Sequence, residues 1–198
     1  MRAYLAFMAP RLAEIWRLLR PEGSIYLHCD AHACHYLKVM LDAIFGAQNF
    51  RNEIVWGYRT GGVSKKHWPR KHDTLLFYVK SSAYQHNPLQ ERIYYEKPFF
   101  TANQDEQGRY YADVFVRDVW EDIKPLINVS KERLGYPTQK PLALLERLIS
   151  ASSKPGDIVF DPFCGCGTAL DAAHGLKRHW VGIDLTVLAL EPMERRLR

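Results

Sequence analysis

A glycine-containing turn between a buried strand and a helix constrains this chain more than any other feature of its sequence. Residues 161–168 read DPFCGCGT, and they follow an apolar run and precede a helical pattern that starts near Ala169. A ligand can approach the backbone closely at Gly165 and Gly167 because neither residue has a side chain. A strand, a glycine turn and a helix in this order predict a nucleotide-binding α/β fold.

The residues around this turn narrow the class of ligand. Asp184 ends the next predicted strand, 19 residues after Gly165, and an acid at that place typically binds ribose hydroxyls. A dinucleotide fingerprint needs a third glycine where this chain has Leu170, and no Lys-Ser/Thr pair follows as in a phosphate loop. The turn therefore predicts a nucleoside site without a pyrophosphate, and S-adenosylmethionine is such a ligand. The alternative is a glycine turn that only packs the strand against the helix.

Hydrophobic periodicity elsewhere predicts alternating strands and helices. Helical spacing covers residues 5–19, where Pro10 should kink or restart the helix, and returns over 37–44 and 142–149. Short apolar runs predict strands at residues 24–28, 54–56, 75–79, 158–160 and 180–183. We therefore expect one α/β domain over residues 1–198 with a parallel sheet, and an irregular inserted region over residues 57–135.

Composition places the chain among ordinary globular proteins. Its 198 residues suit one domain with an insertion, and 47% hydrophobic and 13% aromatic residues exclude disorder across the chain. No apolar run approaches the roughly 20 residues of a membrane helix, so we expect no membrane partner. Four cysteines make no disulfide scaffold, which predicts a reducing, cytoplasmic setting.

The positive charge is concentrated in one segment. The net charge is +5, and residues 51–72 contain six basic residues and one acidic residue, so this window accounts for the whole excess. Such a concentration is the footprint of a contact with a polyanion. The candidate nucleic-acid contacts are Arg59, Lys65, Lys66, Trp68, Arg70 and Lys71. A solvated loop is the alternative for this run of charges.

Several motifs together resemble a known family, the amino-methylating DNA methyltransferases, which methylate N6 of adenine or N4 of cytosine. These motifs are TQKP at residues 138–141, DPFCGCGT and VGID at residues 181–184. Their order resembles the permuted class whose cofactor motif lies near the C-terminus, as do the segments GSIYLHCD and FRNEIVW. The resemblance implies a Rossmann-like, S-adenosylmethionine-dependent methyltransferase fold, with double-stranded DNA as partner and residues 57–135 as the target-recognition region.

The resemblance also implies roles for individual residues. Asp184 would hold the ribose, and residues 138–140 would contact the methionine end of S-adenosylmethionine. The methionine carboxylate suits Lys140 and the backbone N–H groups at a helix start, although Lys140 taken alone reads as a solvated surface lysine. The implied cofactor-binding residues are Thr138, Gln139, Lys140, Asp161, Phe163, Gly165, Gly167, Thr168 and Asp184.

The catalytic motif of that family is not found in this sequence. The motif is Asp, Asn or Ser, then Pro-Pro, then Tyr or Phe; its acceptors bind the target amino group and its ring stacks on the flipped base. Residues 1–198 contain no Pro-Pro, and the glycines after Asp161 assign that similar segment to the cofactor. In the permuted class the motif precedes the segment that begins at Tyr4, so we expect it upstream of Met1.

The motif's strand would lie between the predicted strands at 24–28 and 158–160, so we expect an incomplete sheet with unpaired edges. We favour a fragment or truncated homologue that is inactive by itself. The sheet could also close up, or a complementing chain or homodimer partner could fill the gap. Two other functions stay open, a binding module without chemistry and a methyltransferase acting on RNA or protein, although the basic window favours nucleic acid.

The run from His28 to His35 is rich in potential metal ligands. Zinc sites usually draw paired ligands from two separated places, and no second pair accompanies this run. We therefore expect no metal site. Asp30 is expected to cap the following helix, and it is the one residue of the run that could face the cofactor crevice.

Overall fold

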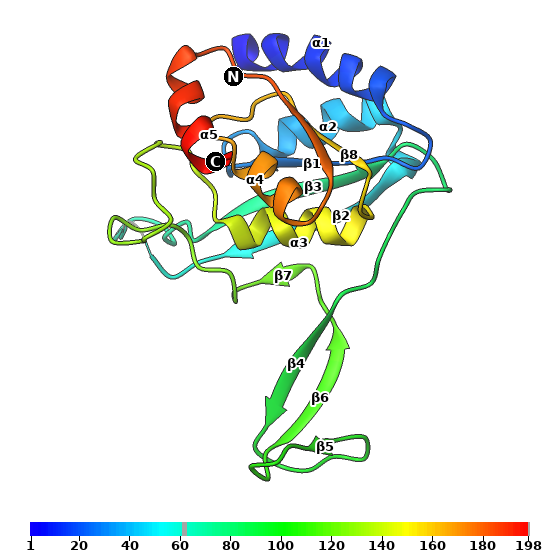
Figure 1. The fold of residues 1–198 in the computed structure, drawn as a ribbon, viewed down its shortest axis with the longest axis vertical. Coiled ribbons are helices and arrows are strands. Elements are labelled where there is room, and N and C mark those ends of the chain that lie inside the picture. Colours follow the sequence, from blue (N-terminus) through cyan, green and yellow to red (C-terminus); the bar gives the residue numbers. More distant parts are fainter. Residues whose placement is uncertain (61–62, 198) are drawn as a thin grey trace.

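A four-stranded sheet forms the centre of the body of the molecule (Figure 1). The computed structural model describes residues 1–60 and 63–197, so the Gly61-Gly62 pair lies outside the described residues. The strand order is β1 (Ser24–Cys29), β3 (His72–Val79), β2 (Phe50–Gly57) and β7 (Val119–Trp120).

This sheet is mixed, which corrects the expectation of a parallel one. β3 runs antiparallel to both β1 and β2, and only β7 is parallel to its neighbour β2. The physical reason is the connection: the structure describes no helix in the residues it covers between β2 and β3, so β3 returns beside β2. Antiparallel strands need only a short loop, whereas parallel neighbours need a crossover.

Two helices cover one face of this sheet (Figure 1). Helix α1 (Arg2–Leu18) and helix α2 (Cys34–Phe45) bury Leu12, Leu37 and Leu41 against it. Helix α1 continues through Pro10, so of the two expected outcomes, a kink or a restart, the restart does not occur. Pro10 and Ala6, four residues earlier, are both exposed, so water can satisfy the carbonyl that loses its partner.

The opposite face is covered by helix α3 (Leu142–Ser152), whose Leu144 and Leu148 are buried among residues of β2 and β3. Helix α4 (Thr168–Gly175) packs on α3 through small side chains. A second, parallel sheet consists of β8 (Ile158–Asp161) and β9 (His179–Gly182). The chain then forms helix α5 (Leu190–Leu197), which the sequence patterns did not predict.

The two sheets are separate in the described part of the chain. There β1 pairs only with β3, and β8 pairs only with β9, so each has an unpaired edge, as the expected incomplete sheet requires. β9 is also poorly covered, because Trp180 and Val181 are 38% and 48% exposed. Parallel strands are normally buried on both faces, so this sheet lacks part of its packing.

A three-stranded arm projects away from the body (Figure 1). It consists of β4 (Gln90–Tyr95), β5 (Asn103–Gln104) and β6 (Tyr110–Phe115), in the order β4-β6-β5. Residues 57–135 were expected to form one irregular region. Among the described residues, however, β3 and β7 belong to the central sheet, and β4, β5 and β6 form a regular sheet in the arm. In the described residues no helix has both the length and the apolar character needed to cross a bilayer.

Candidate functional site

The glycine turn has the geometry that its sequence predicts. The backbone dihedral φ is +49° at Gly165 and +77° at Gly167, a region that favours glycine. A Cβ at Gly165 would lie 2.9 Å from Tyr136, and one at Gly167 would lie 2.7 Å from Met193. Tyr136 and Met193, which the sequence analysis did not select, thus pack against the two glycines of the turn.

Asp184 lies directly against this turn. Its Oδ2 accepts the Gly165 N–H at 2.8 Å, and its Oδ1 accepts the Thr186 N–H at 3.0 Å. The parallel strands β8 and β9 end at the same edge, which brings the two motifs together. The apolar side chains of Phe163, Ile183 and Leu185 are exposed beside them. A carboxylate at the glycine turn and an apolar surface beside it fit a nucleoside with a planar base.

Asp161 and Thr168, both predicted to bind the cofactor, make contacts within the turn. Asp161 accepts the Phe163 N–H at 3.0 Å. Burial raises the pKa of Asp161, and the nearby charge of Asp184 raises it further. Thr168 is buried, and its hydroxyl lies 3.6 Å from the Cys166 Sγ. Phe163 is partly exposed and contacts Phe7 of α1, with 6.5 Å between the ring centroids.

The segment 138–140 lies between this turn and the end of β1, and its three residues differ in their contacts. Thr138 is exposed. The Gln139 side chain accepts the Leu134 N–H at 2.8 Å and donates to the Glu132 carbonyl at 2.7 Å, so it holds its own loop. Glu132 also accepts the Leu142 N–H. The Leu142 N–H at the first turn of α3 thus already has an acceptor within the chain, and contact of this helix start with the cofactor carboxylate stays a prediction.

Lys140 belongs to a cluster at the carboxyl end of β1 that the sequence analysis did not find. His28 Nε2 lies 2.9 Å from Asp73 Oδ2, and the Tyr58 hydroxyl donates to Asp73 Oδ1 at 3.2 Å. The His28 ring meets Trp56 edge-on, with 5.8 Å between the centroids. Their separation along the chain explains the omission, because Asp73 follows His28 by 45 residues and no local pattern links them.

The cluster affects the ionisation of its members. Burial lowers the pKa of His28, the hydrogen bond to Asp73 opposes that effect, and Lys140 lowers the pKa further. Burial alone would raise the pKa of Asp73. Its hydrogen bonds with His28 and Tyr58, and the charge of Lys140, outweigh burial and leave the pKa of Asp73 lowered. The ionised Asp73 beside a neutral His28 is therefore the state favoured near neutral pH.

The basic loop, residues 58–71, leaves the body at the same edge. Arg59, Lys65, Lys66 and Arg70 are exposed, and Trp68 is 92% exposed. Lys71 is half-buried, and its Nζ donates to the Thr60 carbonyl at 3.1 Å. Arg51, which the charge count includes, lies at the other end of β2, where its guanidinium sits 5.0 Å above Tyr84. The charge concentration at this edge therefore excludes Arg51.

A chain of hydrogen bonds ties the basic loop to the turn after β1. Arg70 donates to His32 Nε2 at 2.9 Å, and His32 Nδ1 lies 3.1 Å from Asp30 Oδ2. Asp30 Oδ1 also accepts the backbone N–H groups of His32 and Ala33. Helix α2 begins only at Cys34 with Ala33 as its N-cap, so Asp30 stabilises the preceding turn and does not cap the helix. No group of three potential metal ligands is found among the described residues.

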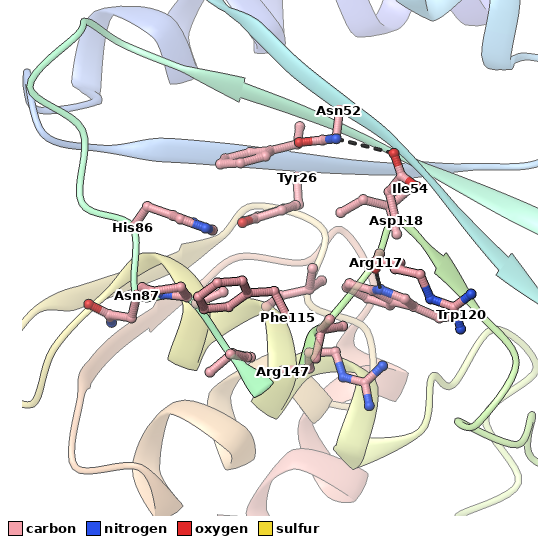
Figure 2. Close-up of a pocket in the computed structure, with 16 residues that line it drawn as sticks. Tyr26, Asn52, Ile54, His86, Asn87, Phe115, Arg117, Asp118, Trp120 and Arg147 are labelled. Atoms are coloured by element: carbon pink, nitrogen blue, oxygen red, sulfur yellow. Dashed lines mark hydrogen bonds between the residues drawn. The ribbon is translucent and has the colours of Figure 1, made fainter. Parts of the chain in front are cut away.

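A cavity of about 460 Å³ lies elsewhere, between the sheet, α3 and the base of the arm (Figure 2). Tyr26, Asn52, Phe115, Trp120 and Arg147 are among the residues that line it. Neither the glycine turn nor Asp184 contributes to its walls. The cavity is therefore separate from the glycine turn and from Asp184.

Comparisons of the sequence with a family profile and with individual proteins agree on one class of enzyme. A family profile described as DNA methylase, for the N6 and N4 class, matches residues 1–191. The chain is 33% identical over 195 residues to the type II methyltransferase M.HpaI of Haemophilus parainfluenzae, covering 98% of this chain and 59% of that protein. It is 30% identical over 192 residues to the DNA adenine methyltransferase YhdJ of Escherichia coli K12, covering 94% and 64%. The chain thus spans about three fifths of the length of these relatives.

Solved structures share the fold. The chain resembles the M1.HpyAVI–SAM complex with a TM-score of 0.68 and 22% identity, covering 96% of this chain and 82% of that one. It resembles the cytosine-N4-specific PvuII DNA methyltransferase with a TM-score of 0.72 and 14% identity, covering 98% and 71%. At these identities the likeness establishes the methyltransferase fold that the sequence predicted.

Proposed function

Because the chain belongs to the N6/N4 DNA methylase family, we propose that it is the cofactor- and DNA-binding part of a DNA amino-methyltransferase. The reaction transfers a methyl group from S-adenosylmethionine to N6 of adenine or N4 of cytosine in double-stranded DNA. The observation that carries this proposal is the contact of Asp184 with the Gly165 turn. This contact places a ribose acceptor beside the glycine turn and an apolar surface.

In this proposal, different residues of the site contact different parts of the cofactor. Asp184 accepts hydrogen bonds from the ribose hydroxyls, and Phe163 and Leu185 offer apolar surface to the adenine. Lys140 lies toward β1, where it suits the carboxylate of the methionine end. The cofactor supplies an electrophilic methyl group on its sulfonium sulfur; the protein binds it and orients it toward the target.

The basic loop supplies the contact with the DNA backbone. Arg59, Lys65, Lys66 and Arg70 project from the edge at which β1 ends, and Trp68 is available for stacking. The arm differs because its arginines pair with acids, in Arg92–Asp113 and Arg109–Asp105, and Arg117 just after the arm pairs with Glu91. We therefore assign phosphate contact to the loop. Residues 57–135 as a whole remain the proposed target-recognition region.

The acceptors for the target amine come, in this proposal, from polypeptide other than residues 1–198. These residues contain no Pro-Pro, and β1 and β8 each have an unpaired edge in the described structure. The segment belongs either to the same longer polypeptide or to a complementing subunit. In the second case this chain is a binding module. The four cysteines are free and buried, which supports the cytoplasmic setting we propose.

Replacement of Asp184 tests the cofactor assignment. The Asp184→Ala variant removes a charged acceptor from the ribose hydroxyls, and hydrogen bonds to charged groups contribute about 1.5–3 kcal/mol. Affinity for S-adenosylmethionine should therefore fall about tenfold or more. Titration calorimetry on the folded protein measures it.

The matched control is Asp157→Ala. Asp157 also accepts a backbone N–H, from Lys154 at 2.8 Å, but it lies before β8, at the opposite end of that strand. This variant should bind the cofactor as the unmodified protein does. Equal affinities of the Asp184→Ala variant and the unmodified protein would refute the assignment.

The methylated product tests the reaction class. The chain is combined with a segment of a family relative that carries the polar-Pro-Pro-aromatic motif, and the methylated DNA is digested to nucleosides. N6-methyladenine or N4-methylcytosine is the expected product, since both arise from exocyclic amines. Methyl transfer to RNA or protein in preference to DNA, or methylation at a ring carbon, would overturn the proposal.

A further inference from the structure

Nδ1 of His28 has no role in the cofactor site proposed above. Its Nε2 faces the carboxylate of Asp73 at 2.9 Å. An ionised carboxylate can only accept hydrogen bonds, so Nε2 carries the hydrogen and the neutral ring keeps a lone pair on Nδ1. His28 is thus a hydrogen-bond acceptor at neutral pH.

That acceptor is accessible. Nδ1 makes no hydrogen bond with any residue the structure describes, and it is not among the fully buried polar atoms that lack a partner. The side chain as a whole is 19% exposed. A partner that reaches Nδ1 must donate a hydrogen bond, because the tautomer is fixed by Asp73.

The charges around His28 are of both signs. Asp73 of β3 and Asp30 of the turn after β1 are acidic, and Lys140 ahead of α3 is basic; all three charges act on the His28 ring. A ligand end that carries an ammonium group and a carboxylate matches this arrangement. The methionine end of S-adenosylmethionine is such a zwitterion, with Lys140 suited to its carboxylate.

Residues 136–140 connect the glycine turn with the surroundings of His28. Tyr136 packs against Gly165 at the turn, and the charge of Lys140, four residues later, acts on both His28 and Asp73. A cofactor with its ribose at Asp184 and its carboxylate at Lys140 would extend along residues 136–140 toward the end of β1. The target amine is a weaker match for Nδ1, because the family motif already supplies acceptors for both of its hydrogens.

We propose that Nδ1 of His28 accepts a hydrogen bond from the ammonium group at the methionine end of the cofactor. This inference rests on the proposed function. Asp73 acts as a positioning residue that fixes the tautomer, and Asp30 adds negative charge near the ammonium group. Protonation of His28 would place a hydrogen on Nδ1 and a positive charge on the ring, so it would abolish the interaction.

The test compares S-adenosylmethionine, by titration calorimetry, with a deamino analogue whose amino group is replaced by a hydrogen atom and therefore cannot donate to Nδ1. The unmodified protein should bind the natural cofactor about tenfold more tightly or better, since a charge-assisted hydrogen bond is at stake. The His28→Phe variant keeps an aromatic ring against Trp56 but no acceptor, and it should lose this preference. The His28→Asn variant, whose amide oxygen reaches near the position of Nδ1, should retain part of it.

Two further measurements separate this role from a structural one. The preference should decline as the pH falls below the ordinary histidine value of 6.5 toward the lowered pKa of His28, and the His28→Phe variant should show no such decline. Nitrogen NMR of the unmodified protein should show an unprotonated Nδ1 that responds to the cofactor and not to the deamino analogue. This readout serves even where a variant fails to fold.

The possible results distinguish failure of the proposed function from failure of the inference about His28. Failure of the unmodified protein to bind S-adenosylmethionine would reject the proposed function and this inference together. Cofactor binding with the full preference retained in the His28→Phe variant would reject this inference alone. A response of Nδ1 to the amino group of free deoxyadenosine or deoxycytidine, with none to the cofactor, would assign His28 to the target base and also reject it.

Discussion

Residues 1–198 by themselves are expected to methylate DNA at least about a thousandfold more slowly than the same residues combined with a strand that carries the missing motif. The lone pair of the exocyclic amine is delocalised into the base, which makes the nitrogen a poor nucleophile. Acceptors placed against its N–H groups localise that pair and orient it toward the methyl group. Loss of one preorganised group of this kind costs about 10²–10³ in rate, and here the whole motif is missing.

A tritiated methyl-transfer assay on mixed-sequence DNA measures this difference. The control is the same added segment with the polar residue of its motif changed to alanine, which should dock but restore little activity. Fusion of the segment ahead of Met1 and its addition as a separate chain distinguish a longer polypeptide from a complementing subunit. Rapid transfer by residues 1–198 alone would show that another group binds the amine, with Asp30 the first residue to test.

The conformation of the glycine turn could be predicted from sequence because the residues that determine it are close together in the chain. Gly165 and Gly167 adopt the positive φ values that their residue type allows, and the register of β8 with β9 follows from a short α4 between them. Asp184 then reaches Gly165 because both lie at the same edge of two adjacent parallel strands. Each step depends on neighbours within about one supersecondary unit.

The errors arose where distant segments meet. The position of β3 between β1 and β2 depends on how a loop returns, and hydrophobic periodicity carries no such information. The hydrogen bonds of Gln139 to Leu134 and Glu132 were likewise not predicted, and its contact with the cofactor stays a prediction. The His28–Asp73 pair was missed because packing alone brings the two residues together.

Removal of the basic loop's charge is the second change for which we expect a large effect. The variant that replaces Lys65, Lys66, Arg70 and Lys71 with alanine should bind DNA much more weakly, and its affinity should depend less on salt. Each phosphate contact contributes about 0.9 to the slope of log affinity against log salt, so four contacts would flatten the slope by about 3–4. Lys71 already donates to the Thr60 carbonyl, which favours the lower value.

A salt series followed by fluorescence anisotropy measures the slope. The matched control replaces four basic residues at the opposite edge of the sheets: Arg17, Arg20, Lys154 and Lys177. It changes the net charge by the same amount, so it separates local phosphate contact from the general attraction of a basic protein for DNA. Equal flattening in both variants, or none in the loop variant, would show that the loop is solvated and that DNA contact lies elsewhere, with the arm the next surface to test.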